Sequence, residues 1–121
     1  MAANQSLRGP ARTAVHQCMN LQPDESCVVV TDEERQAIGE AIYRVAAEVT
    51  EDVAILRYPP GDQHGEEPPD PVAGAMRTAD VVLAPTTKSL SHTLARTEAT
   101  DAGARVATLP EITDAVFLMG M

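Results

Sequence analysis

The sequence predicts a three-layer, Rossmann-like α/β domain, in which a parallel sheet lies between two layers of helices. Two observations predict this fold class. Four short apolar runs lack the alternating polar pattern of a half-exposed strand, which is typical of strands buried on both faces. A segment with helical spacing of apolar residues precedes each run, so the elements follow the order α-β-α-β-α-β-α-β. Right-handed crossovers between such strands give a parallel sheet with helices on both faces.

The first half of the chain supplies two helices and the first strand. Residues 6–20 form the first predicted helix, in which Pro10 is tolerated because it is near the start. Residues 27–30 (CVVV) form a continuous β-branched run, which predicts the first buried strand. Asp32 is the expected N-cap of the next helix, which extends to about Thr50.

The middle of the chain supplies two further strands and a short helix. Residues 53–56 (VAIL) predict a second buried strand, and a polar loop follows over residues 61–69. Asp70 is the expected cap of a short helix that has Pro71 at its first position. Residues 80–84 then form the third strand.

The last part of the chain supplies one more helix and one more strand. The helix is expected to begin near Ser89 and to stop at Gly103, which has the position of a C′ glycine. Residues 105–109 form the fourth strand. The apolar tail over residues 111–121 is expected either to pack on the sheet or to lead into a further domain. All 121 residues therefore form one α/β domain.

The composition excludes several classes of partner. The chain has 18 acidic against 9 basic side chains and a formal net charge of −9, so it repels phosphate backbones and anionic membranes. Aromatic residues make up only 2%, which removes the stacking surfaces that single-stranded nucleic acids require. Lys88 is the single lysine, and an acid-rich, lysine-poor chain indicates a salt-adapted (halophilic) protein; a GC-rich genome would give the same excess of arginine.

The two cysteines and the hydropathy profile indicate a cytoplasmic protein. Cys18 and Cys27 have neither metal-pair nor CxxC spacing, and both fall in apolar periodic segments, so each is expected to be a small buried side chain. No signal peptide precedes the first helix, and no apolar run approaches the length of a membrane span.

The main candidate site follows the third strand. The stretch from Pro85 to Arg96 combines hydroxyl groups, an imidazole, a lysine and an arginine. It lies at the predicted carboxyl end of a strand, where open α/β sheets bind ligands. His92 and Arg96 would share a helix face, and with Ser89 could form an anion-binding cluster near the helix N-terminus. The alternative is structural, with Thr87 or Ser89 capping the helix.

Other sites are weaker. His64-Gly65-Glu66-Glu67 offers groups that can bind metal, but the Pro-Cys-x-x-Cys of zinc deaminases is absent downstream. A solvated loop is the favoured interpretation, and a mobile wall of a cleft is the alternative. The acids after the first strand also exclude a glycine-rich dinucleotide-binding loop.

Four segments of the chain belong together as a pattern. They are ESCVVVTDE (25–33), HGEEPP (64–69) with Met76, the ADVV run (79–82) leading into PTTKSLSHTLAR (85–96), and GARVATLP (103–110) followed by Ile112-Thr113. With these segments the chain resembles the N-terminal domain of one family, the leucyl aminopeptidases that include aminopeptidase T. The 2,5-dihydroxypyridine dioxygenases look like relatives of the same architecture. Glu111 departs from the glycine expected in the family's Pro-Gly-Ile-Thr turn.

The resemblance implies the N-terminal part of a two-domain, homodimeric metallopeptidase that removes N-terminal amino acids from peptides. Divalent metal ions (Zn, Co, Mg or Mn) would activate water there, held by a C-terminal domain, so no metal ligand and no catalytic residue is assigned in these 121 residues. Thr86, Ser89, His92 and Arg96 are expected to form part of a substrate cleft. The alternatives are a dioxygenase domain, which needs iron and oxygen, and a non-catalytic binding or dimerisation module.

Overall fold

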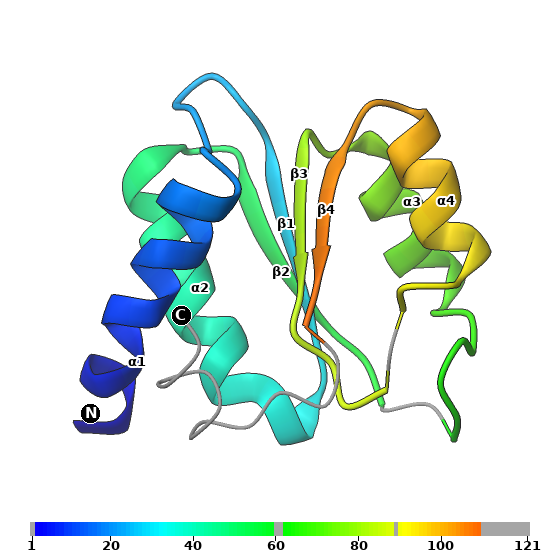
Figure 1. The fold of residues 1–121 in the computed structure, drawn as a ribbon, viewed down its shortest axis with the longest axis horizontal. Helices are drawn as coiled ribbons and strands as arrows, with labels where there is room; N and C mark the ends of the chain where they lie inside the picture. Colours follow the sequence, from blue (N-terminus) through cyan, green and yellow to red (C-terminus); the bar gives the residue numbers. More distant parts are fainter. Residues whose placement is uncertain (1, 60–61, 89, 110–121) are drawn as a thin grey trace.

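The structure is a computed structural model and describes residues 2–59, 62–88 and 90–109. A four-stranded, all-parallel sheet with strand order β2-β1-β3-β4 runs through the middle of the molecule (Figure 1). The strands are β1 (Cys27–Thr31), β2 (Val53–Arg57), β3 (Val81–Ala84) and β4 (Arg105–Thr108). The predicted α/β fold class is confirmed, and no helix among the described residues is long and apolar enough to cross a membrane.

Helices cover the two faces of the sheet (Figure 1). One layer contains α1 (Ala2–Arg12), the π-helical turn η1 (Thr13–Cys18) and α2 (Gln36–Val49), which follows the short 3-10 turn η2 (Glu33–Arg35). The other layer contains α3 (Asp70–Thr78) and α4 (Leu94–Asp101). Asp70 is the first residue of α3 rather than its cap, which is Pro69.

The central strands divide the core into two halves. Alternate residues of β1 point to opposite faces, so Val29 packs with α1 and α2 while Val30 packs with α3 and α4. Val81 and Val82 of β3 divide in the same way. Both strands are buried along their whole length, as their unbroken apolar sequences predict.

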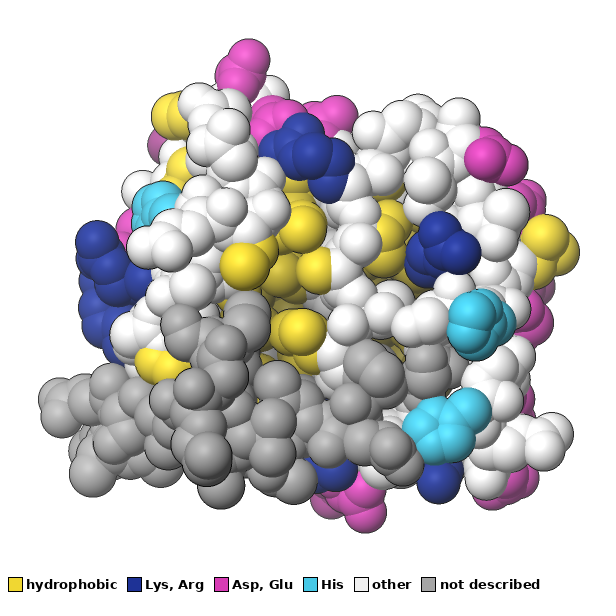
Figure 2. Space-filling model, in the orientation of Figure 1, with side chains coloured by type: hydrophobic (Ala, Val, Ile, Leu, Met, Phe, Trp, Pro, Cys, Tyr) yellow, Lys and Arg dark blue, Asp and Glu magenta, His cyan; other side chains and the backbone are white. Residues whose placement is uncertain are grey.

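The prediction of a fully buried second strand is wrong. Within the described part of the chain, β2 pairs only with β1, and Ala54 is exposed while Val53 and Ile55 are half-buried. The fourth strand lies at the other edge and is also only partly covered. Figure 2 shows hydrophobic side chains that remain visible between the two helical layers on one face of the molecule.

The first helix differs from its prediction in two respects. It begins earlier than expected, and Pro10 lies inside α1 rather than near its start. Just beyond it the helix widens into η1, closed by a hydrogen bond from Met19 N to Ala14 O at 3.0 Å. Cys18 is exposed, which contradicts its expected burial, because the wider turn carries it off the core-facing stripe; Cys27 is buried as predicted.

The fourth helix begins later than the sequence suggests. Thr93 is its N-cap, with Oγ1 accepting a hydrogen bond from Arg96 N at 3.1 Å, so the expectation that the helix begins near residue 89 is wrong and Thr87 does not cap it. The preceding residues form a loop in which Thr93 Oγ1 also donates to Leu90 O at 2.7 Å. The end is as predicted, since Gly103 has a φ of +106° and follows the last turn. Ser89 and the expectations for the 110–121 segment lie outside the described residues.

Candidate functional site

The carboxyl ends of the parallel strands meet at one edge of the sheet, where the arrowheads lie in Figure 1. From β1 the chain passes to its neighbour β2 and then returns to the other side of β1 as β3, so the strand order reverses between β1 and β3. Ligands of open α/β sheets bind in the crevice at such a reversal point. Asp32 follows β1 there, and Thr86 and Thr87 follow β3.

The side chain of Asp32 lies in this crevice and binds the loop that follows β3. Its side chain is only 1% exposed, and Oδ1 accepts a hydrogen bond from Arg35 N at 3.1 Å. Asp32 therefore caps the 3-10 turn η2 that leads into α2, whereas the N-cap of α2 itself is Arg35, so the predicted capping role is confirmed only for the turn. Thr87 N donates to Oδ2 at 2.6 Å, and Thr87 Oγ1 lies 3.0 Å from Oδ1. These donors offset the cost of burying a carboxylate, so Asp32 holds the β1 and β3 loops together. No local sequence pattern indicates the contact with Thr87, because the two residues are 55 positions apart.

The three predicted cleft residues that the structure describes, Thr86, His92 and Arg96, each have different surroundings. Thr86 is buried, and its Oγ1 donates to Lys88 O at 2.6 Å, so its hydroxyl is used within the loop. Arg96 Nε donates to Ser91 O at 2.9 Å, and Nη1 reaches Thr100 Oγ1 at 3.5 Å. His92 is exposed and precedes α4, so the expectation that it shares a helix face with Arg96 is wrong. A role of these residues toward substrate stays a prediction.

The acidic loop over residues 62–69 is exposed but attached to α4. Glu67 accepts hydrogen bonds from Leu94 N at 2.7 Å and Ala95 N at 3.1 Å, which are free N–H groups of the first turn of α4. Glu66 accepts from Asp62 N at 2.6 Å within the loop itself. The loop is therefore exposed over most of its length, as the favoured interpretation predicts, and is held at Glu67 to the first turn of α4. The mobility expected in the alternative interpretation stays a prediction.

A hollow of about 380 Å³ lies between this loop and the loop after β3. Its walls come from the end of β2, from the 62–69 loop and from the β3 loop; the lining residues are Tyr58, Pro59, Gln63, Glu66, Glu67, Pro69, Lys88 and Leu90. Burial raises the pKa of the Tyr58 phenol to about 12, and the charges of Asp32 and Glu66 add to the effect. A phenol is protonated at neutral pH in any case, so the Tyr58 hydroxyl can donate a hydrogen bond there, and the raised pKa keeps it protonated in more basic solution as well.

The described residues contain no group of three or more His, Cys, Asp or Glu side chains placed to hold a metal ion. His64 is exposed on the 62–69 loop, and His16 is exposed on η1. The prediction that metal ligands come from elsewhere is not tested by this observation.

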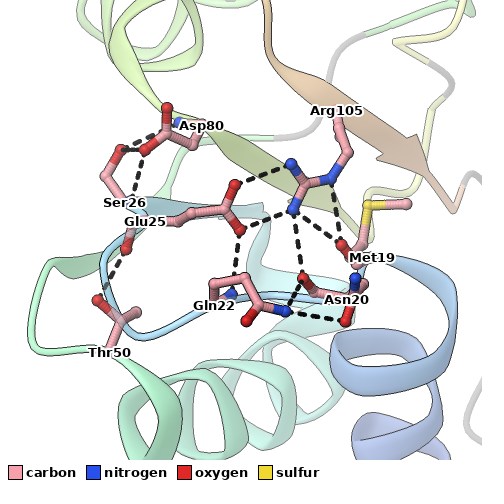
Figure 3. A network of polar contacts seen from close by, with 8 residues as sticks. All are labelled: Met19, Asn20, Gln22, Glu25, Ser26, Thr50, Asp80 and Arg105. Atoms are coloured by element: carbon pink, nitrogen blue, oxygen red, sulfur yellow. Dashed lines mark hydrogen bonds and ion pairs between the residues drawn. The ribbon is translucent and has the colours of Figure 1, made fainter.

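At the amino ends of the strands, opposite the hollow, a network of polar contacts has a structural role (Figure 3). Arg105 forms a two-pronged ion pair with Glu25, with Nη2 to Oε1 at 2.7 Å and Nη1 to Oε2 at 2.8 Å, and also donates to Met19 O. The hydrogen bonds from Arg105 lower the pKa of Glu25. Asp80 accepts from Ser26 N at 2.9 Å in the same region. These contacts tie the turn before β1 to β3 and β4.

The all-parallel sheet, with its strand order reversing between β1 and β3, makes this chain a Rossmann-like α/β domain. No family model matches the chain, and no curated protein matches it. Among solved structures, it is similar to the 2,5-dihydroxypyridine dioxygenase from Pseudomonas putida KT2440, with a TM-score of 0.66 and 16% sequence identity. The match covers 87% of this chain and 34% of the dioxygenase chain, so this chain spans about a third of its neighbour.

Proposed function

We propose that the chain serves as the α/β domain of a two-domain enzyme with the architecture of the 2,5-dihydroxypyridine dioxygenases. The observation that carries this proposal is the structural match, which includes nearly all of this chain but only a third of the dioxygenase. At 16% identity the match establishes a shared fold, so the activity is an analogy. It agrees with the alternative expected from the sequence rather than with the aminopeptidase.

In such an enzyme the described residues would build a wall of the site. Asp32 and Thr87 fix the two central loops at the sheet edge, and Glu67 fixes the neighbouring loop on α4. Among the described residues, no group of three or more potential metal ligands converges. In this proposal the iron of a dioxygenase would be held by residues of the second domain, as the sequence resemblance implies, and no chemical step is assigned here.

The aminopeptidase is a second candidate, favoured by the paired motifs over residues 85–96 and 103–110. It needs divalent metals and peptide, whereas a dioxygenase needs ferrous iron, oxygen and an aromatic substrate. The two activities are therefore separable in one preparation.

The test uses the protein encoded by the complete reading frame. One portion is loaded with ferrous iron under argon and assayed for oxygen uptake with 2,5-dihydroxypyridine. Another portion is loaded with zinc, cobalt, magnesium or manganese and assayed for release of aniline from aminoacyl-anilides. Oxygen uptake that depends on iron supports the proposal, whereas anilide cleavage alone establishes the aminopeptidase. A reading frame that ends at Met121 and gives a folded, inactive dimer identifies a non-catalytic module.

A further inference from the structure

The hollow at the carboxyl end of the sheet has the dimensions and the walls of a ligand site. Its volume of about 380 Å³ falls within the range of small-molecule pockets. Two of its walls are tied to neighbouring backbone, because Glu67 accepts a hydrogen bond from the first turn of α4 and Thr86 Oγ1 donates to Lys88 O. These contacts reduce the ordering that ligand binding requires at those two walls.

Lys88 is the lysine in the lining, and its ammonium forms no ion pair with any residue that the structure describes. Glu67 is neutralised in part by two backbone N–H groups and the positive end of α4, and Glu66 accepts backbone N–H groups of its own loop. The Lys88 ammonium forms no hydrogen bond or ion pair with any described residue, although the chain has twice as many acids as bases. An unpaired cation in a concave site attracts an anion.

The rest of the lining suits a ligand that has an apolar body and one polar group. Pro59, Pro69 and Leu90 supply apolar surface, and the ring of Tyr58 adds to it. The Tyr58 hydroxyl is a donor at neutral pH, as a phenol ordinarily is, and the raised pKa extends this range further into base.

We propose that this hollow binds a small organic carboxylate, with the carboxylate on the Lys88 ammonium and the apolar body against Leu90 and the two prolines. The proposal does not depend on which reaction the larger enzyme performs, because it concerns only groups in this chain. A zwitterion or an amine would also meet Glu66, and the choice of probes separates these classes.

The experiment titrates the ¹⁵N-labelled 121-residue chain with benzoate at pH 7 and follows the amide signals. Benzylamine and benzyl alcohol, which keep the ring but change the charged group, are titrated in parallel. We expect benzoate to shift the signals of Gln63, Lys88 and Leu90 in a saturable manner, with at least about tenfold tighter binding than benzyl alcohol, because a charge-assisted hydrogen bond is lost in the alcohol.

Variants identify the cation. Lys88→Met should weaken benzoate binding about tenfold and Lys88→Arg should retain most of it. Arg44→Met is the matched control, because it removes one positive charge from an exposed position on α2 and should leave the affinity unchanged. Equal binding of benzoate and benzyl alcohol, tighter binding of benzylamine, equal losses in Lys88→Met and Arg44→Met, or shifts only outside the hollow would each overturn the proposal.

Discussion

A single added methyl group should destabilise the chain at one glycine and stabilise it at another. Gly39 lies inside α2 and is buried against β1, and a Cβ built there would lie 2.8 Å from Thr31 Cβ and 2.9 Å from Thr31 Cγ2. Gly74 lies inside α3, where the nearest atom to an added Cβ is Arg77 Nη2 at 3.8 Å. The two substitutions are chemically identical, so the comparison isolates the packing of α2 on the sheet.

The expected magnitudes follow from two opposing effects. Replacing glycine by alanine inside a helix stabilises by about 0.5–1 kcal/mol. Gly74→Ala should therefore raise the free energy of unfolding by about that amount. At Gly39 the helix must move away from β1, since the obstructing atoms belong to a strand residue rather than to a flexible side-chain end; overpacking of this kind costs about 1–3 kcal/mol. Gly39→Ala should therefore lower the free energy of unfolding by up to about 2.5 kcal/mol after the helix gain, with a central value of about 1 kcal/mol.

Urea unfolding monitored by circular dichroism measures both changes, and unchanged m-values show that the unfolded states are comparable. If Gly39→Ala does not fold, Gly39→Ala in a Thr31→Gly background provides the test, because removal of the Thr31 side chain relieves the contact. The cost of the alanine should be smaller in that background than beside Thr31. A Gly39→Ala protein as stable as the parent would refute the close approach of α2 to β1.

Four further predictions concern charges and thiols. In the native protein, Ellman's reagent should modify exposed Cys18 at once and Cys27 only on unfolding, because burial raises the pKa of the Cys27 thiol to about 12; two fast thiols would contradict this. Glu25→Gln should lower the free energy of unfolding by up to about 1 kcal/mol at pH 7. The pKa of Glu25 is lowered in the folded state, so its stabilisation is lost on protonation, and the difference in stability from the parent should shrink as the pH falls below 4.5. A difference that grows in acid would refute this prediction. Glu67→Gln, but not Glu66→Gln, should speed hydrogen exchange at the Leu94 and Ala95 amides; equal rates in both variants would show that Glu67 does not hold α4. The melting temperature should rise as potassium chloride increases from about 0.1 to about 2 M, because screening relieves the repulsion of nine excess acids; a flat or falling curve would remove the case for salt adaptation.

The central strands were predictable because a strand that is buried on both faces has apolar residues at successive positions. The runs at β1 and β3 contain no polar residue that would have to reach water. The run at β2 has an equally apolar sequence, yet Ala54 is exposed, because strand order decides which strand is central. That order depends on which side of β1 each crossover takes, and no local pattern records the choice.

The start of α4 shows a second limit of local reasoning. Thr87, Ser89 and Thr93 are all residues that cap helices well, so composition alone could not choose among them. The structure selects Thr93, where Glu67 from a distant loop satisfies the free N–H groups of Leu94 and Ala95. The predicted pairing of His92 with Arg96 failed for the same reason, since it depended on the earlier helix start.

The contact between Asp32 and Thr87 also determines where a ligand can approach the sheet. In an open α/β sheet the crevice between β1 and β3 is the expected entry, but here a buried carboxylate and a threonine occupy it. The N-terminus of α4, the nearest alternative for an anion, is already bound by Glu67. Of the groups that line the hollow, this leaves Lys88 as the cation that can receive an anion at this edge. Asp32→Ala should reopen the crevice and loosen the β3 loop, so benzoate shifts that then spread from Lys88 toward Thr31 would show that this carboxylate sets the position of the site.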